Sequence, residues 1–155
     1  MKCLSGLLLL VATTIVMFGC DKVKSVTNGD VSLVKGGTLE IDKSLTVGQA
    51  IDNYKYFKKT EWESLKTDNG RRIVQVKADI DTAKSPSLNP EKLPGLKSAQ
   101  IQFQFKINTD KSFEVAWCGI ASEKTDGTKI DPDQSANMQY CLRTLKGIYD
   151  NEPNI

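Results

Sequence analysis

The sequence predicts an α+β domain in two layers, with an antiparallel sheet of about four strands, one helix before the sheet and one helix after it. Two patterns carry this prediction. Segments 74–80 and 100–107 alternate apolar with polar residues, which is typical of strands with one buried face. Segments 46–57 and 131–149 start with helix-capping residues and then repeat apolar residues at helical spacing. There is no internal repeat and no strand–helix–strand alternation, so a parallel sheet is not expected.

The first helix is predicted from a capping box. Thr46 and Gln49 have the spacing at which the threonine hydroxyl accepts a backbone hydrogen bond and the glutamine side chain returns to the cap. We expect the aromatic side chain of Tyr54 in the core and its neighbours at positions 56 and 57 at the rim. Segment 31–41, before this helix, carries a weak strand signal that two glycines interrupt. Apolar residues recur at helical spacing at Val47, Ala50, Ile51 and Tyr54.

Two hairpins are predicted to follow. In segment 60–80, Asn69-Gly70 is a strong turn signal because both residues tolerate positive φ. Segment 100–120 forms the second hairpin, with its turn near 108–110. Between them, the proline-containing segment 81–98 is either a loop that contacts a partner or a solvated crossover. The first strand of the second hairpin places one set of residues on the apolar face and another on the polar face: Ile101, Phe103, Phe105 and Ile107 against Gln100, Gln102 and Gln104.

The returning strand of the second hairpin leaves one question open. Its alternation directs Phe113, Val115 and Trp117 inward. The same alternation sends Cys118 to the opposite face. Either a β-bulge lies near Gly119, or Cys118 meets a partner at the end of the sheet.

The last helix is predicted from its cap and its apolar stripe. Asp131 has the position of an N-cap, Pro132 that of the first helical residue, and Gln134 that of the third. The apolar residues that follow at helical spacing form one face: Met138, Cys141, Leu142, Leu145, Ile148 and Tyr149.

The amino terminus has the pattern of an export signal. Lys2 is followed by an uncharged apolar stretch over residues 4–18, which is shorter than a membrane span of about 20 residues. The stretch ends in Met17-Phe18-Gly19-Cys20, which resembles the lipobox of bacterial lipoproteins. This resemblance covers residues 1–21 only and implies that Cys20 is acylated on its thiol and becomes the first residue of the mature chain. The folded part of the chain carries no motif that we associate with a family.

These features suggest three parts and a location. Residues 1–19 form the lipoprotein signal peptide, residues 20–30 the lipidated cysteine with a polar tether, and residues 31–155 a single α+β domain. Acyl chains on Cys20 then hold the protein on the cell membrane or the outer membrane, facing the periplasm or the exterior. Asp21 follows the lipidated position, and the choice between the two membranes stays open.

The remaining cysteines fit an exported protein. Cys3 leaves with the signal peptide, so Cys118 and Cys141 are the pair left in an oxidising compartment. We expect them to form a disulfide, which by the chain-entropy model contributes about 3 kcal/mol. The alternative is a free reactive thiol, which lacks a CxxC spacing or a histidine partner here.

Composition excludes several classes of function. The formal net charge is +2, which gives no strong attraction to nucleic acid. The chain contains no histidine, so catalytic triads, imidazole bases and histidine-containing zinc sites are excluded. No nucleotide-binding or metalloprotease motif occurs, and we expect neither a catalytic set, nor a metal, nor a cofactor.

The sequence therefore predicts a lipid-anchored envelope protein that works without enzymatic activity, by contact with another envelope protein, as an accessory, exclusion or inhibitor factor. The alternative is a protein that binds a small ligand or a cell-wall fragment in a cleft between helix and sheet. Tyr54, Trp62 and Trp117 are the candidate walls of that cleft.

Overall fold

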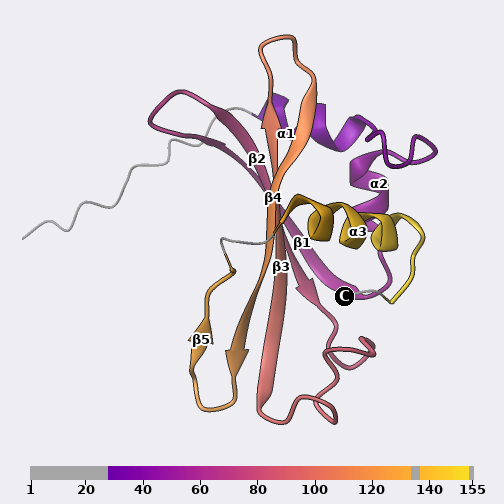
Figure 1. Cartoon of the computed structure of the whole chain (residues 1–155), viewed down its shortest axis with the longest axis vertical. Coiled ribbons are helices and arrows are strands. Elements are labelled where there is room, and N and C mark those ends of the chain that lie inside the picture. The colour runs from indigo at the N-terminus through magenta and orange to yellow at the C-terminus, as the bar shows by residue number, and fades with distance from the viewer. Residues whose placement is uncertain (1–27, 134–136, 154–155) are drawn as a thin grey trace, which may run out of the picture.

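The structure is a computed structural model that describes residues 28–133 and 137–153. Within these residues the chain forms one antiparallel five-stranded sheet, with strands in sequence order and helices before and after it, which confirms the predicted α+β fold (Figure 1). The predicted signal peptide and Cys20 lie outside the described residues. The elements are α1 (Asn28–Gly36), α2 (Val47–Asp52), β1 (Phe57–Lys66), β2 (Arg72–Ile80), β3 (Leu96–Ile107), β4 (Phe113–Lys124), β5 (Lys129–Ile130) and α3 (Met138–Tyr149).

The helices cover one face of the sheet and leave the other face without a helical layer (Figure 1). The hydrophobic core lies between the two layers because the apolar sides of the strands and helices face each other. Its fully buried side chains come from both layers: Val74, Val76, Ile101, Phe103 and Phe105 from the sheet, and Val34, Val47, Ile51, Leu145 and Ile148 from the helices.

Both predicted hairpins form, and β2 and β3 have the expected faces. Gly70 has φ 79° in the turn between β1 and β2, where a glycine is suited to a positive φ. The alternating residues of β2 and β3 are buried on the helix side, as predicted. β5 is a fifth strand that the sequence did not indicate, and it pairs with only Ser122 and Glu123 of β4. β1 forms one edge of the sheet, and Lys59 and Glu61 make an ion pair there with Nζ 2.5 Å from Oε1.

A bulge in β4 changes the predicted orientation of its second half. Gln104 of β3 pairs with Trp117, whereas the next residue, Phe105, pairs with Val115, so Ala116 has no partner on β3. Beyond this extra residue the alternation is reversed. Cys118 is therefore fully buried on the helix side, and Trp117 lies on the opposite face with Gln104. The expected inward position of Trp117 was wrong, and the bulge precedes Trp117 rather than lying near Gly119.

The reversal allows the predicted disulfide. Cys118 and Cys141 are joined with their Cα atoms 5.5 Å apart, which is an ordinary separation for a disulfide. Both cysteines are fully buried. The bond connects β4 to α3 and ties the last helix to the sheet.

The region predicted as a weak strand is a helix instead. α1 covers Asn28–Gly36, so the start of segment 31–41 is helical and residues 28–30 belong to the domain rather than to the expected tether. Asp30, in the first turn of α1, is buried and accepts hydrogen bonds from Arg72 Nε at 3.0 Å and from Ser64 Oγ at 3.3 Å. Arg72 also forms an ion pair with the second Asp30 oxygen. This contact holds α1 against β1 and β2.

The second helix has the predicted cap but ends earlier than predicted. Both hydrogen bonds of the capping box at Thr46 and Gln49 are present. The helix stops at Asp52 instead of near residue 57, because β1 already begins at Phe57. Asp52 lies at the junction of three elements and accepts hydrogen bonds from Thr60 Oγ1 and Trp62 Nε1, both at 2.8 Å, and pairs with Lys35 Nζ at 2.6 Å.

The last helix begins later than predicted. Its N-cap is Asn137, whose side chain accepts from the backbone of Tyr140, so Asp131 does not cap it. The expected N3 residue at 134 lies outside the described residues. On the predicted apolar stripe, Met138 and Leu142 are 42% and 39% exposed. The other members are buried against the sheet: Cys141, Leu145, Ile148 and Tyr149.

The connection between β2 and β3 is shorter than the predicted segment 81–98, because β3 begins at Leu96. Its start is anchored to the domain. Asp81, Thr82 and Ser85 are buried, and Asp81 pairs with Lys84 at 3.2 Å. The two readings of this loop, partner contact or crossover, both stay open.

We expect Asp30→Asn to lower the free energy of unfolding by about 1–2 kcal/mol, because it removes a charged acceptor that Arg72 and Ser64 share. The hydrogen bond from Arg72 lowers the pKa of Asp30 below its usual 3.8, against the effect of burial. The folded state therefore binds fewer protons, and the contribution is complete above the unfolded pKa and lost as pH falls through the lowered one.

Urea unfolding at several pH values measures both effects. Arg71→Gln is the matched control, since Arg71 is exposed and precedes Arg72 in the chain. A wild-type acid dependence that Asp30→Asn leaves unchanged would contradict this role of Asp30.

Candidate functional site

The three aromatic residues expected to line a cleft are not brought together. Tyr54 is only 3% exposed and packs in the core, with its ring 4.7 Å from that of Phe57. Its hydroxyl donates a hydrogen bond to the backbone carbonyl of Glu152 at 2.6 Å. Tyr54 therefore anchors the chain after α3 and does not form a wall accessible to a ligand.

Trp62 packs at the rim of the core. Its ring stacks on that of Phe105, with ring centres 6.3 Å apart and planes at 18°. Lys35 Nζ lies 5.2 Å from the ring centre, within reach of a cation–π interaction. With its Nε1 bound to Asp52, Trp62 stabilises the junction of α1, α2 and β1.

Trp117 lies on the other side of the sheet. Its Nε1 is buried and has no hydrogen-bond partner among the residues that the structure describes. A side chain added at Gly119 would put its Cβ 2.5 Å from Trp117 Cζ2 and 2.8 Å from Pro132 Cβ, so the indole and the proline both crowd this glycine. Gly119 is thus required by close packing.

The face of the sheet away from the helices, called here the outer face, carries linked amide side chains. In one row across the strands, Gln104 Nε2 donates to Gln75 Oε1 at 2.7 Å and Gln75 Nε2 donates to Glu63 Oε1 at 2.9 Å. In the next rows, Gln102 Nε2 donates to Gln100 at 3.1 Å and Gln100 Nε2 donates to Asp79 at 2.8 Å. These bonds hold the glutamines in fixed positions on a polar surface.

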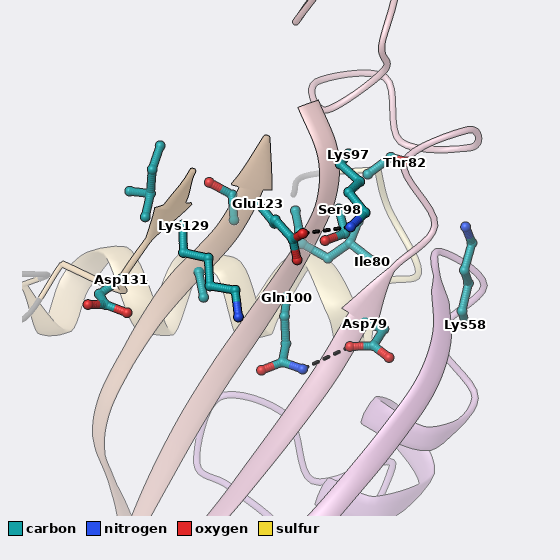
Figure 2. Close-up of a pocket in the computed structure, with 14 residues that line it drawn as sticks. Lys58, Asp79, Ile80, Thr82, Lys97, Ser98, Gln100, Glu123, Lys129 and Asp131 are labelled. Carbon is teal, nitrogen blue, oxygen red and sulfur yellow. Dashed lines mark hydrogen bonds and ion pairs between the residues drawn. The ribbon is translucent and has the colours of Figure 1, made fainter. Parts of the chain in front are cut away.

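A polar groove of about 510 Å³ lies at one end of the outer face, between the β4–β5 hairpin and the end of β2 (Figure 2). Its floor includes Gln100 and Ala121, and the small side chain of Ala121 leaves space there. Charged residues of both signs surround it in equal number: Lys58, Lys97 and Lys129 with Asp79, Glu123 and Asp131. The hydrogen bond from Lys97 lowers the pKa of Glu123, with a smaller contribution from Lys129.

A second groove, the apolar groove, lies on the helix side next to the start of β4. It has a volume of about 670 Å³. Its apolar lining comes from a turn before α2, from β4 and from α3: Leu39, Ile41, Phe113, Val115 and Leu142. Leu142 is 39% exposed, and Met138 one helical turn earlier is 42% exposed. Exposed leucine and methionine beside an apolar hollow form a surface that water solvates poorly.

The carboxyl groups whose pKa values shift are all stabilised in the ionised form. Every carboxyl group with a shifted pKa among the described residues is shifted downward, so these acids stay ionised near neutral pH. Burial raises the pKa of Tyr149 to about 12, which keeps its hydroxyl protonated. Within residues 28–133 and 137–153, no group of three or more Cys, Asp or Glu side chains is arranged to hold a metal ion.

No sequence pattern predicts either groove. Lys129 belongs to a two-residue strand that no pattern indicated. Leu142 was recognised as part of an apolar stripe, but the pattern did not reveal that it would lie outside the core. Among the described helices, none is long and apolar enough to cross a membrane.

Comparison with known proteins identifies no relative. No family model, no curated protein and no solved structure matches the chain.

We expect Gly119→Ala to lower the free energy of unfolding by about 1–3 kcal/mol, because the added methyl group must displace Trp117 or Pro132. Denaturant unfolding followed by the fluorescence of Trp62 and Trp117 reports the stability of each variant. Gly36→Ala is the matched control, since nothing lies within 4 Å of a side chain added there. Equal stability of the two variants would show that the packing around Gly119 adjusts freely.

Proposed function

We propose that this protein is a lipid-anchored bacterial envelope protein that acts without enzymatic chemistry, by binding another envelope protein through the apolar groove. The observation that carries the contact is the groove itself, where exposed Leu142 continues an apolar surface formed by Phe113 and Val115.

The anchor is supported by the order of features at the amino terminus. A positive residue, an apolar stretch and Gly19-Cys20 occur in the order used by lipoprotein signals. The Cys118–Cys141 disulfide is consistent with export, because such bonds persist in oxidising compartments. A lipid anchor also favours weak contacts, since it concentrates the domain near partners on the same membrane.

The contact is supported by the chemistry of the groove. Burial of apolar surface is the main driving force of protein association, and partly exposed side chains around a hollow act as anchors for a partner's apolar residue. Lys111, Glu40 and Glu114 lie among the lining residues and provide polar groups around the apolar part, as in a typical interface. The expected partner therefore presents a short apolar segment flanked by polar residues.

The anchor predicts a defined chemical product. The native protein should begin at Cys20 and be heavier than the unmodified chain by its acyl groups, which intact-mass spectrometry measures. Cys20→Ala should abolish both the cleavage and the added mass. A native product that keeps Met1, or that has the mass of an unacylated chain, would refute the anchor.

The contact predicts that Leu142→Lys removes a specific crosslink. Crosslinking in intact cells, followed by mass spectrometry, should join the wild type to one protein through residues at the apolar groove. Leu142→Lys should lose this product, because it places a charge where the partner buries apolar surface. Leu93→Lys is the matched control, since Leu93 is 42% exposed on the loop between β2 and β3 and does not line the groove.

The test depends on where the crosslinks map on the protein, and not only on whether a partner is crosslinked. Crosslinks that map to the groove, disappear in Leu142→Lys and persist in Leu93→Lys support the proposal. Crosslinks that are equal in both variants, or that map elsewhere, would exclude the apolar groove as the contact surface.

A further inference from the structure

The polar groove on the outer face differs from the apolar groove in the chemistry of its lining. It is lined by charged, amide and hydroxyl groups, and its volume of about 510 Å³ falls in the range of small-molecule sites. The helices lie on the other face of the sheet, so no helix covers it (Figure 1).

Three of the charged lining residues have no ion pair among the described residues: Lys129, Asp131 and Asp79, of which Asp79 accepts a hydrogen bond from Gln100. Lys97 Nζ is 2.6 Å from Glu123 Oε1, and Lys58 Nζ is 3.6 Å from Asp81 Oδ1. By contrast, neither Lys129 nor Asp131 has an oppositely charged group within ion-pair distance among the described residues. Figure 2 shows Lys129 reaching from β5 toward Gln100 on β3, with the carboxylate of Asp131 on its other side.

The balance of charge decides what kind of ligand gains from these groups. The lining holds three lysines and three carboxylates, so a simple anion or cation meets as much repulsion as attraction. A ligand that carries both charges at separate ends can place its carboxylate at Lys129 and its ammonium at Asp131 or Asp79. Both ends then gain, and neither group of the protein stays unpaired.

The neutral part of the groove fits a peptide bond with small side chains. Ser98 and Gln100 offer a hydroxyl and an amide group that donate and accept hydrogen bonds, as a peptide requires. Ala121, which pairs with Gln100 on the outer face, provides a small apolar floor that leaves room for a methyl group.

From these observations we infer that the polar groove binds a short peptide of small residues with free amino and carboxyl termini. The ligand's carboxylate pairs with Lys129, its ammonium with Asp131 or Asp79, and its amide with Gln100. This site is independent of the proposed contact through the apolar groove, and its occupancy requires neither the partner nor the lipid anchor.

The test uses alanyl-alanine as the probe and the full-length native protein, 15N-labelled in detergent micelles. Binding at a groove this open is expected to be weak, with a dissociation constant of about 1 mM. Titration should shift the backbone amide signals of segments 97–100 and 121–131. The N-acetylated and the C-amidated dipeptides should each bind about two- to fivefold more weakly, as expected for the loss of one exposed ion pair.

A variant assigns the carboxylate. Lys129→Gln should weaken the free dipeptide about two- to fivefold and leave the C-amidated form unchanged, because the amide has no charge to lose. Lys66→Gln is the matched control, since Lys66 is exposed at the end of β1 and does not line the polar groove. The variants change exposed side chains, and their amide spectra report directly whether the fold is retained.

The stereochemistry of the probe separates two sources of such a peptide. Preference for the D,D form indicates a peptide derived from the cell wall, and preference for the L,L form indicates a peptide derived from protein; either supports the site. Absence of localised shifts up to about 20 mM probe, or equal binding of the free and blocked dipeptides, would overturn the inference.

Discussion

The bulge at Ala116 determines which side of β4 faces the helices. Because one residue has no partner on β3, the alternation reverses between Val115 and Trp117. Val115 and Cys118 consequently share the buried face although they lie three positions apart. Without this insertion Trp117 would point into the core, and Cys118 would point away from Cys141, so the disulfide to α3 could not form. The covalent link between the layers and the composition of the outer face both depend on this local irregularity.

The parts of the fold that local patterns encode were predictable. β2 and β3 follow a period of two without interruption, and the capping box of α2 needs only residues at positions i and i+3. The bulge was not predictable in position, because it depends on the register with β3. α1 was missed for a similar reason: Asp30 is held by Arg72, far along the chain, and no neighbour of Asp30 signals that contact.

The candidate sites were harder to predict than the fold. Aromatic residue type suggested Tyr54, Trp62 and Trp117 as walls, but tertiary packing uses the first two at the core and places the third on the opposite face. The grooves arise from relations between elements. Leu142 is exposed because the disulfide at Cys141 and the burial of Leu145 fix which side of α3 faces the sheet. The polar groove forms because the short β4–β5 hairpin lies beside the small residue Ala121.

The ion pair between Lys59 and Glu61 affects the tendency of the protein to aggregate. These residues lie on β1, whose outer edge has no neighbouring strand within the described residues. Open edges of this kind tend to add strands from other molecules and grow into fibres, and charged side chains along an edge oppose that growth. Molecules held at a membrane surface would collide often. The charged side chains on the edge strand β1 favour separate molecules over an aggregate under these conditions.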